Sequence, residues 1–241
     1  MARQKNQPSR RSFIKGAAAL GLFHIIPRHV LGGDGITPPS DKIIHAVVGV
    51  GGMGSGHIDY CLRDPKAQLL AVCDVDSKHL ENAVKKAGNG CKGYRDFREV
   101  LDRGDIDVVH IPTPPHWHAL VSIAALNAGC DVWCEKPMTR TIAEGQHVID
   151  AVRRNGRMFR LNTWFRLHSG FYGFGSDVKA IKKLVMHRLL GWPLTVRVSP
   201  FTGFGWKLDW AGKIGKTAGA AETVPPELDY DMWLGPAPYK P

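Results

Sequence analysis

The stretch Gly49-Val50-Gly51-Gly52-Met53-Gly54 decides the fold, because it follows an apolar run (43–48) and opens a helical pattern. In a G-x-G-x-x-G turn the first glycine permits a tight bend. The second lets backbone approach a pyrophosphate, and the third lets helix and strand pack closely. The alternative is a glycine-rich structural turn, since 27 glycines produce some chance spacings. The context favours dinucleotide binding by Gly49, Gly51, Gly52, Met53 and Gly54.

Asp74 supports this interpretation, because it directly follows the apolar run 69–73 and lies 20 residues beyond Gly54. A carboxylate at the end of the second strand accepts hydrogen bonds from a ribose 2′-hydroxyl and repels a 2′-phosphate. The sequence therefore predicts NAD as the cofactor in preference to NADP. Lys78 is close enough in sequence to weaken that preference.

Residues 42–162 alternate short apolar runs with helical patterns, which is typical of a doubly wound α/β fold with a parallel sheet. Glu144 forms a capping-box pair with Thr141 at the start of the last helix, and Gly156 ends that helix. The expected strands are 43–48, 69–73, 108–111, 132–134 and 158–161, and the expected helices lie near 54–62, 78–87, 97–101, 117–128 and 142–154.

A different unit is expected from residue 163, because 13 of the last 79 residues are aromatic against eight of the first 162. Its pattern predicts a loop over 168–176, a helix over 177–190 ended by Gly191, and a strand near 194–199. The chain stops before this second α+β domain is complete, so the expected organisation is 1–33, 42–162 and an incomplete 163–241.

The net charge of +10 is unevenly distributed. Residues 1–33 carry six basic residues and no acidic one, whereas the remainder carries 26 basic and 22 acidic residues, a balance of +4. Nucleic-acid binding needs a clustered basic surface. The dense basic run 179–188 fits the solvated face of one helix, so no nucleic-acid partner is expected.

The amino terminus has the order of an export signal. Arg10 and Arg11 precede an apolar stretch of eleven residues, 16–26, which is too short to span a bilayer. The segment resembles a twin-arginine signal, which implies export of the folded protein by that machinery to the periplasm or envelope. A basic first helix or a retained anchor are the alternatives, and no later segment is long enough for a stable membrane span.

No metal is expected. The five cysteines form no C-x-x-C pair, and Cys73 and Cys134 lie in apolar runs typical of buried strands. His116 and His118 form an H-x-H pattern without a third ligand in view.

Two motifs follow expected strands, where open α/β sheets bind ligands. Thr113-Pro114-Pro115-His116-Trp117-His118 comes after the run 108–111, and Glu135-Lys136-Pro137 after the run 132–134. With these motifs the chain resembles the Gfo/Idh/MocA family, over residues 42–166 and again in the Trp-Leu-Gly-Pro-Ala-Pro segment 233–238.

The resemblance implies an NAD(P)-dependent oxidoreductase that transfers hydride between nicotinamide and a hydroxyl carbon of a sugar or cyclitol. Lys136 would lie beside the nicotinamide and bind the reacting hydroxyl, while Glu135 and Pro137 set the turn. Thr113 and Pro114 would line the nicotinamide, and His118 would begin the following helix. Two further residues, Trp164 and Arg166, either face the substrate or pack at the domain seam.

Pro115 departs from the polar residue usual in the family, and the aspartate and histidine that relatives carry later in the second domain are missing. The chain is therefore expected to be a fragment of a longer protein or a real truncation. Cleavage of a glycoside through transient oxidation is an alternative activity, and a nucleotide-binding module without catalysis is another. The oligomeric state stays open, although members of the family commonly associate through the open sheet of the second domain.

Overall fold

The protein is described from a computed structural model, which covers residues 37–88, 90–163, 178–195 and 223–239. The chain divides into two units, Met1–Lys42 and Ile43–Pro241. In the first, the described part holds one 3-10 turn, η1 (Pro39–Asp41). All the strands that the structure describes belong to the second unit.

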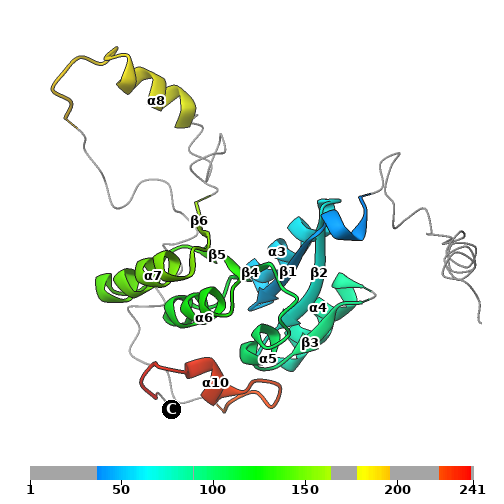
Figure 1. Ribbon diagram of the computed structural model, residues 1–241. Helices are drawn as coiled ribbons and strands as arrows, with labels where there is room; N and C mark the ends of the chain where they lie inside the picture. The colour runs from blue at the N-terminus through cyan, green and yellow to red at the C-terminus, as the bar shows by residue number, and fades with distance from the viewer. Residues whose placement is uncertain (1–36, 89, 164–177, 196–222, 240–241) are drawn as a thin grey trace, which may run out of the picture. The chain divides into compact units, whose positions relative to one another are not determined.

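Six parallel strands form one sheet in the order β3-β2-β1-β4-β5-β6 (Figure 1). The chain moves outward on one side of β1 and then crosses to β4 on the other side, so the order reverses between these two strands. The strands are β1 (Ile43–Val48), β2 (Ala67–Cys73), β3 (Lys92–Tyr94), β4 (Val108–Ile111), β5 (Asp131–Glu135) and β6 (Phe159–Asn162).

Five helices alternate with the strands and confirm the predicted Rossmann-type α/β fold. They are α3 (Gly52–Arg63), α4 (Ser77–Ala87), α5 (Phe97–Leu101), α6 (Pro115–Asn127) and α7 (Ile142–Asn155). The expected helices and strands lie within a few residues of the observed ones. The exception is β3, which was not predicted because Lys-Gly-Tyr is too short and too polar to form an apolar run.

The sheet separates two apolar cores, because successive side chains of a strand point to opposite faces. Ala46 and Val48 of β1 belong to the core that includes residues of α5, α6 and α7. Val47, between them, belongs to the core that includes residues of α3 and α4. Helices therefore cover both faces, as a doubly wound sheet requires.

The predicted helix cap is confirmed. Thr141 and Glu144 form a reciprocal capping box at the start of α7, and Gly156 ends the helix in the left-handed conformation with φ 61°. The cap matters for the site because α7 follows the turn at the end of β5.

All five cysteines are buried and free. Cys73 and Cys134 lie in strands, as predicted. Burial raises the pKa of Cys134 to about 12. A thiol with such a pKa stays protonated near neutral pH and is a poor nucleophile.

Beyond residue 163 the structure describes two helices, α8 (Val178–Met186) and α10 (Tyr230–Leu234). The first matches the core of the helix predicted over 177–190, and Gly191 has a positive φ of 78°. Lys182, Lys183 and His187 are exposed, in agreement with a solvated basic face. Residues 194 and 195 are not in a strand, and the rest of the strand predicted near 194–199 lies outside the described residues, as does the loop 168–176.

The domain boundaries at 33, 42 and 163 stay predictions. Among the described residues, no helix is both long and apolar enough to cross a membrane.

Candidate active site

The glycine turn lies where the ends of β1 and β4 meet. Gly49 has a φ of 92°, and a Cβ there would lie 3.0 Å from the Thr113 nitrogen. A Cβ on Gly54 would overlap the carbonyl group of Gly49, whereas a Cβ on Gly52 would meet nothing within 4 Å. The two closely packed glycines thus keep α3 against the turn. Gly51 caps α3 without any side-chain cap, which leaves the first backbone N–H groups available to an anion.

Asp74 is fixed beside this turn. It follows β2 directly, and its Oδ2 accepts a hydrogen bond from the Val50 N–H at 2.7 Å. Its Oδ1 accepts from the Asp76 N–H at 2.9 Å. Both oxygens keep lone pairs for a further donor, so the carboxylate is oriented and can still bind a hydroxyl.

A cavity of about 580 Å³ opens over the carboxyl ends of β1, β2 and β4. Its lining includes the glycine turn, Asp74, Thr113 and Pro114, which the sequence predicted as cofactor ligands. Thr113 Oγ1 is buried and has no hydrogen-bond partner among the described residues. The lining continues with residues that the sequence did not single out as ligands, namely His79, Arg95, Phe97, Trp117, Met232 and Trp233.

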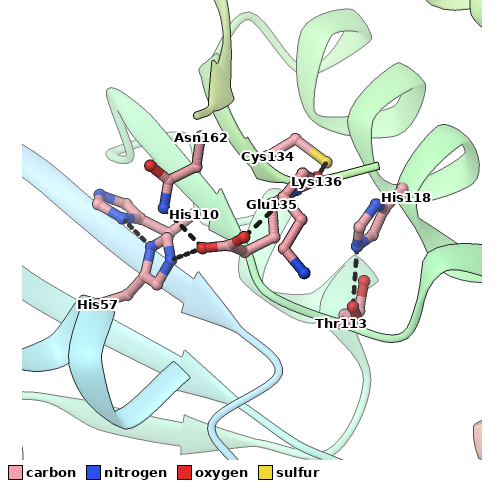
Figure 2. A network of polar contacts seen from close by, with 8 residues as sticks. All are labelled: His57, His110, Thr113, His118, Cys134, Glu135, Lys136 and Asn162. Atoms are coloured by element: carbon pink, nitrogen blue, oxygen red, sulfur yellow. Dashed lines mark hydrogen bonds and ion pairs between the residues drawn. The ribbon is translucent and has the colours of Figure 1, made fainter. Parts of the chain in front are cut away.

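Glu135 closes β5 and is held by three hydrogen bonds (Figure 2). Its Oε1 accepts from Asn162 Nδ2 at 2.6 Å and from His57 Nε2 at 3.2 Å, and its Oε2 accepts from the Lys136 N–H at 3.1 Å. Burial raises the pKa of Glu135, but the hydrogen bonds from His57, Asn162 and Lys136 outweigh it and hold the pKa below 4.5. The buried carboxylate is therefore ionised and anchors the turn that presents Lys136.

Lys136 is exposed at the end of β5, just before a cis Lys136–Pro137 peptide bond. Its backbone N–H binds Glu135, so the main chain is fixed while the side chain extends from the turn (Figure 2). Its ammonium makes no hydrogen bond with any part of the chain that the structure describes. Such a group can bind a substrate oxygen and stabilise negative charge on it.

His118 joins the two predicted motifs. The ring is 1% exposed in α6. Its Nε2 lies 2.8 Å from the Thr113 carbonyl oxygen (Figure 2). Its Nδ1 lies 2.6 Å from the Pro137 carbonyl oxygen, and a neutral ring donates to one of these two acceptors. His118 therefore sets the position of the loop after β4 relative to the turn after β5, rather than pointing into open space.

Three histidines continue the network from Glu135 into the core. His57 Nδ1 lies 3.0 Å from His110 Nδ1, and His110 Nε2 lies 2.9 Å from His45 Nδ1. Because a carboxylate only accepts, a single assignment satisfies every contact when all three rings are neutral. His45 donates to His110, His110 to His57, and His57 to Glu135. Three neutral rings thus pass hydrogen bonds in one direction to the carboxylate beneath Lys136.

Cys61 lies against the same histidines. Its Sγ is 3.9 Å from His110 Nε2, and the ligand-type atoms of His45, Cys61 and His110 lie within 4.8 Å of one another. The hydrogen bonds between rings already account for the nitrogen atoms. Burial, and after it Asp64, raises the pKa of Cys61 to about 12. The cluster is explained as a buried polar network, and the absence of a metal stays a prediction.

The structure brings most of the predicted residues together in two adjoining groups. Gly49, Gly51, Gly52, Met53, Asp74, Thr113 and Pro114 line the cavity, and Gly54 packs beneath the turn. His118, Glu135, Lys136 and Pro137 form the neighbouring group at the ends of β4 and β5. Trp164 and Arg166 lie outside the described residues.

Sequence reasoning missed His57 and Asn162, which hold Glu135, and it assigned no ligand role to Arg95 or Trp233. Lys78, which was expected to weaken the preference for NAD, forms an ion pair with Glu227 instead. No local pattern marks these residues, because each acts through a contact with a distant part of the chain.

A doubly wound parallel sheet with a G-x-G-x-x-G turn, an acidic residue after β2 and a cavity at the reversal of strand order defines a dinucleotide-binding domain. The description "Oxidoreductase family, NAD-binding Rossmann fold" of the Gfo/Idh/MocA family matches residues 43–163. That family's "C-terminal alpha/beta domain" matches residues 174–241. The chain belongs to the Gfo/Idh/MocA oxidoreductase family.

The chain is similar to inositol 2-dehydrogenase of Salmonella typhimurium, with 30% identity over 196 residues that cover 80% of this chain and 55% of the relative. It is also similar to glycosyl hydrolase family 109 protein 2 of Shewanella sp. (strain ANA-3), with 32% identity over 51% of this chain and 28% of the relative. Among solved structures, the WlbA dehydrogenase from Chromobacterium violaceum in complex with NADH and UDP-GlcNAcA superposes with a TM-score of 0.56 and 26% identity, over 63% of this chain and 41% of that one.

The chain spans about half the length of the inositol dehydrogenase that it resembles, or 55% of it. The residues present fit NAD, because the glycine turn leaves room for a diphosphate, Asp74 is oriented beside it, and Thr113 Oγ1 lacks a partner among the described residues.

Proposed function

We propose that the protein is an NAD-dependent oxidoreductase that transfers hydride between the nicotinamide and a hydroxyl carbon of a sugar or cyclitol. The observation that carries the proposal is Lys136, whose exposed ammonium stands on a turn fixed by Glu135 and next to the cofactor cavity. The resemblance to inositol 2-dehydrogenases over 80% of the chain supports a cyclitol or sugar as the substrate class.

NAD supplies the hydride acceptor when it is bound. Loss of hydride from an alcohol carbon requires its hydroxyl proton to leave, and negative charge develops on that oxygen. The Lys136 ammonium is suited to donate a hydrogen bond to the oxygen and stabilise the charge. Glu135 holds the turn through the Lys136 N–H, and His118 ties that turn to Thr113, so the residues around the reacting carbon keep one geometry.

The test is a Lys136→Ala change in the protein at its natural length, assayed for NADH formation over a panel of cyclitols and sugars. We expect turnover to fall about 10²- to 10⁴-fold, the usual contribution of a group that assists proton transfer. Lys85→Ala is the matched control, because Lys85 is an exposed lysine of α4 outside the cavity lining. Equal turnover of the two variants on every active substrate would refute the role of Lys136.

Glycoside cleavage is a second candidate, favoured by the 32% identity to a glycosyl hydrolase family 109 protein. In this reaction, removal of hydride at one sugar carbon acidifies the neighbouring C–H bond. The glycosidic substituent is then eliminated, water adds, and the hydride returns. Release of sugar without accumulation of NADH would identify this reaction, whereas stoichiometric NADH would identify simple oxidation. Bound NAD with neither product would contradict both and favour a binding module.

Two further features belong to this proposal. Trp164 and Arg166 follow β6, whose end carries Asn162 beside Glu135, and we assign them to substrate contact. The Arg10-Arg11 segment supports export by the twin-arginine route to the periplasm or envelope. That route carries folded proteins, so the cofactor could be bound before export.

A further inference from the structure

The cavity over β1, β2 and β4 has a wall from a distant part of the chain. Leu228, Met232 and Trp233 line it together with the glycine turn and Asp74, although more than 150 residues separate Asp74 from Leu228. Glu135 and Lys136 do not belong to this lining. The distant segment, residues 225–235, therefore forms one wall of the cavity that the glycine turn and Asp74 also line.

One end of segment 225–235 pairs with the loop that follows Asp74. Asp76 and Leu228 form an antiparallel bridge. The Ser77 N–H donates to the Glu227 carbonyl at 3.0 Å, and the Asp229 N–H donates to the Val75 carbonyl at 3.0 Å. This end is thus fixed by main-chain hydrogen bonds directly beside the carboxylate that is oriented for the ribose.

The other end docks on the start of α6. The Trp233 carbonyl accepts hydrogen bonds from Trp117 Nε1 at 3.0 Å and from His116 Nε2 at 2.9 Å. Gly235 lies so close to Trp117 that a Cβ would overlap its indole ring. Segment 225–235 therefore crosses from the loop after β2 to the loop after β4, and these contacts account for His116 and for the glycine of the Trp-Leu-Gly-Pro-Ala-Pro stretch.

The position of the cavity identifies the part of NAD that the segment would meet. The diphosphate of a dinucleotide lies on the glycine turn, and the acidic residue after the second strand binds the adenosine ribose. The adenine then extends past Asp74 and away from β5. The cavity lining includes the flat or polarizable side chains of Phe97, Trp117, Met232 and Trp233, of which Phe97 packs edge-on against Trp117, and such side chains suit the face of an aromatic base.

We propose that residues 225–235 form an adenine-binding wall, so that the Rossmann domain and a segment from the second family domain jointly enclose the adenine of NAD. The proposal rests on NAD binding and is independent of the reaction. In this proposal His116 holds the segment through the Trp233 carbonyl, which gives this histidine a structural role in place of metal binding.

Two variants test the wall in different ways. Trp233→Leu removes an aromatic face but keeps the carbonyl that anchors the segment, whereas Gly235→Ala displaces the segment from Trp117. Val224→Ala is the control, because Val224 is 45% exposed and outside the lining. Thermal unfolding without ligand shows whether each variant is folded. If Gly235→Ala does not fold, Trp233→Leu carries the test.

The measurement is the dissociation constant of the full chain for NAD, for ADP-ribose, which shares the adenine end, and for nicotinamide mononucleotide, which lacks it. We expect both variants to bind NAD and ADP-ribose about 5- to 150-fold more weakly, the range found for loss of base stacking. Binding of nicotinamide mononucleotide should not change. Unchanged affinity for NAD, or an equal loss for all three ligands, would overturn the proposal.

Discussion

Asp74 shows how a single residue can set cofactor choice. Its carboxylate is fixed by the Val50 and Asp76 N–H groups, and Arg95 lines the same cavity with its guanidinium bonded to the Val75 carbonyl at 3.0 Å. A negative charge at this place favours a free 2′-hydroxyl and repels a phosphate. The Arg95 guanidinium can favour a 2′-phosphate only once the charge of Asp74 is removed.

We therefore predict that Asp74→Asn weakens NAD binding modestly and strengthens NADP binding. The amide keeps one acceptor oxygen and leaves one of the Val50 and Asp76 N–H groups without an acceptor. It loses the repulsion and leaves Arg95 to attract the 2′-phosphate. Titration of the chain with both cofactors should show their affinity ratio shifting about tenfold or more toward NADP, equivalent to about 1.4 kcal/mol. Asp102→Ala, at an exposed carboxylate outside the cavity lining, should leave the ratio unchanged. A ratio that stays the same in Asp74→Asn would contradict the role of the charge.

The glycine turn gives a second residue-scale prediction, because its glycines differ in the space around them. Gly54→Ala should destabilise the fold by about 3 kcal/mol, the upper part of the usual overpacking range, since its methyl group would overlap the Gly49 carbonyl. Gly52→Ala has open space and should keep wild-type stability. Chemical denaturation without cofactor measures the difference. Equal stability of the two variants would contradict the prediction, because the turn would then accommodate the methyl group of Gly54→Ala without loss of stability.

At the scale of elements, the sequence predicted helices and strands well where burial forces a clear pattern. β1 and β4 have the predicted bounds and are apolar except for one histidine each, because a parallel strand is covered on both faces. β3 sits at an edge and is formed by Lys92–Tyr94, which has no such signal. The Glu135-Lys136-Pro137 turn was predictable from its place after β5, but its supports His57 and Asn162 were not, because both are contacts across the sheet.

The buried histidine network links α3, β1, β4 and β5, and it makes stability depend on pH. Burial, and after it His45 and His57, lowers the pKa of His110 to about 2. Burial also lowers the pKa of His45, against the opposing charges of Asp64 and Asp107. An unfolded histidine binds a proton near pH 6.5, whereas His110 in the folded protein does not. The free energy of unfolding therefore falls as the pH drops below about 6.5.

We predict a decrease of up to about 1.4 kcal/mol per pH unit from His110 alone. Glu135 adds to the loss only below about pH 4.5, because its pKa is lowered from that value. Urea denaturation between pH 7.5 and pH 5 isolates the histidine part. The slope of the free energy of unfolding against pH should be smaller in His110→Gln by up to about 1.4 kcal/mol per pH unit, which corresponds to one proton. It should be unchanged in the control His147→Gln, at an exposed histidine of α7. Equal slopes for His110→Gln and the wild-type protein would mean that His110 takes up a proton without unfolding.

At the scale of the whole molecule, the proposed export and the cofactor site are connected. The cavity receives residues from both family domains, since the first matches 43–163 and the second 174–241. A cofactor enclosed as proposed would be bound only after the two segments had folded together. A route that carries folded proteins therefore suits this protein better than one that threads unfolded chains.

This connection predicts the behaviour of the signal and of the cofactor together. Lysine keeps the charge but not the guanidinium that a twin-arginine receptor reads. Arg10→Lys combined with Arg11→Lys should therefore abolish export of the native-length protein in its host. Arg3→Lys, outside the motif, should not affect export. Fractionation followed by assay of bound NAD should show cofactor-loaded protein retained in the cytoplasm for the double variant and cofactor-loaded protein in the envelope for the control.

Retained protein without NAD would separate twin-arginine export from cofactor loading before export, because export would then depend on the arginines while loading depended on a later step. Undiminished export of the double variant would exclude the twin-arginine route and with it the argument that the enclosed site selects it.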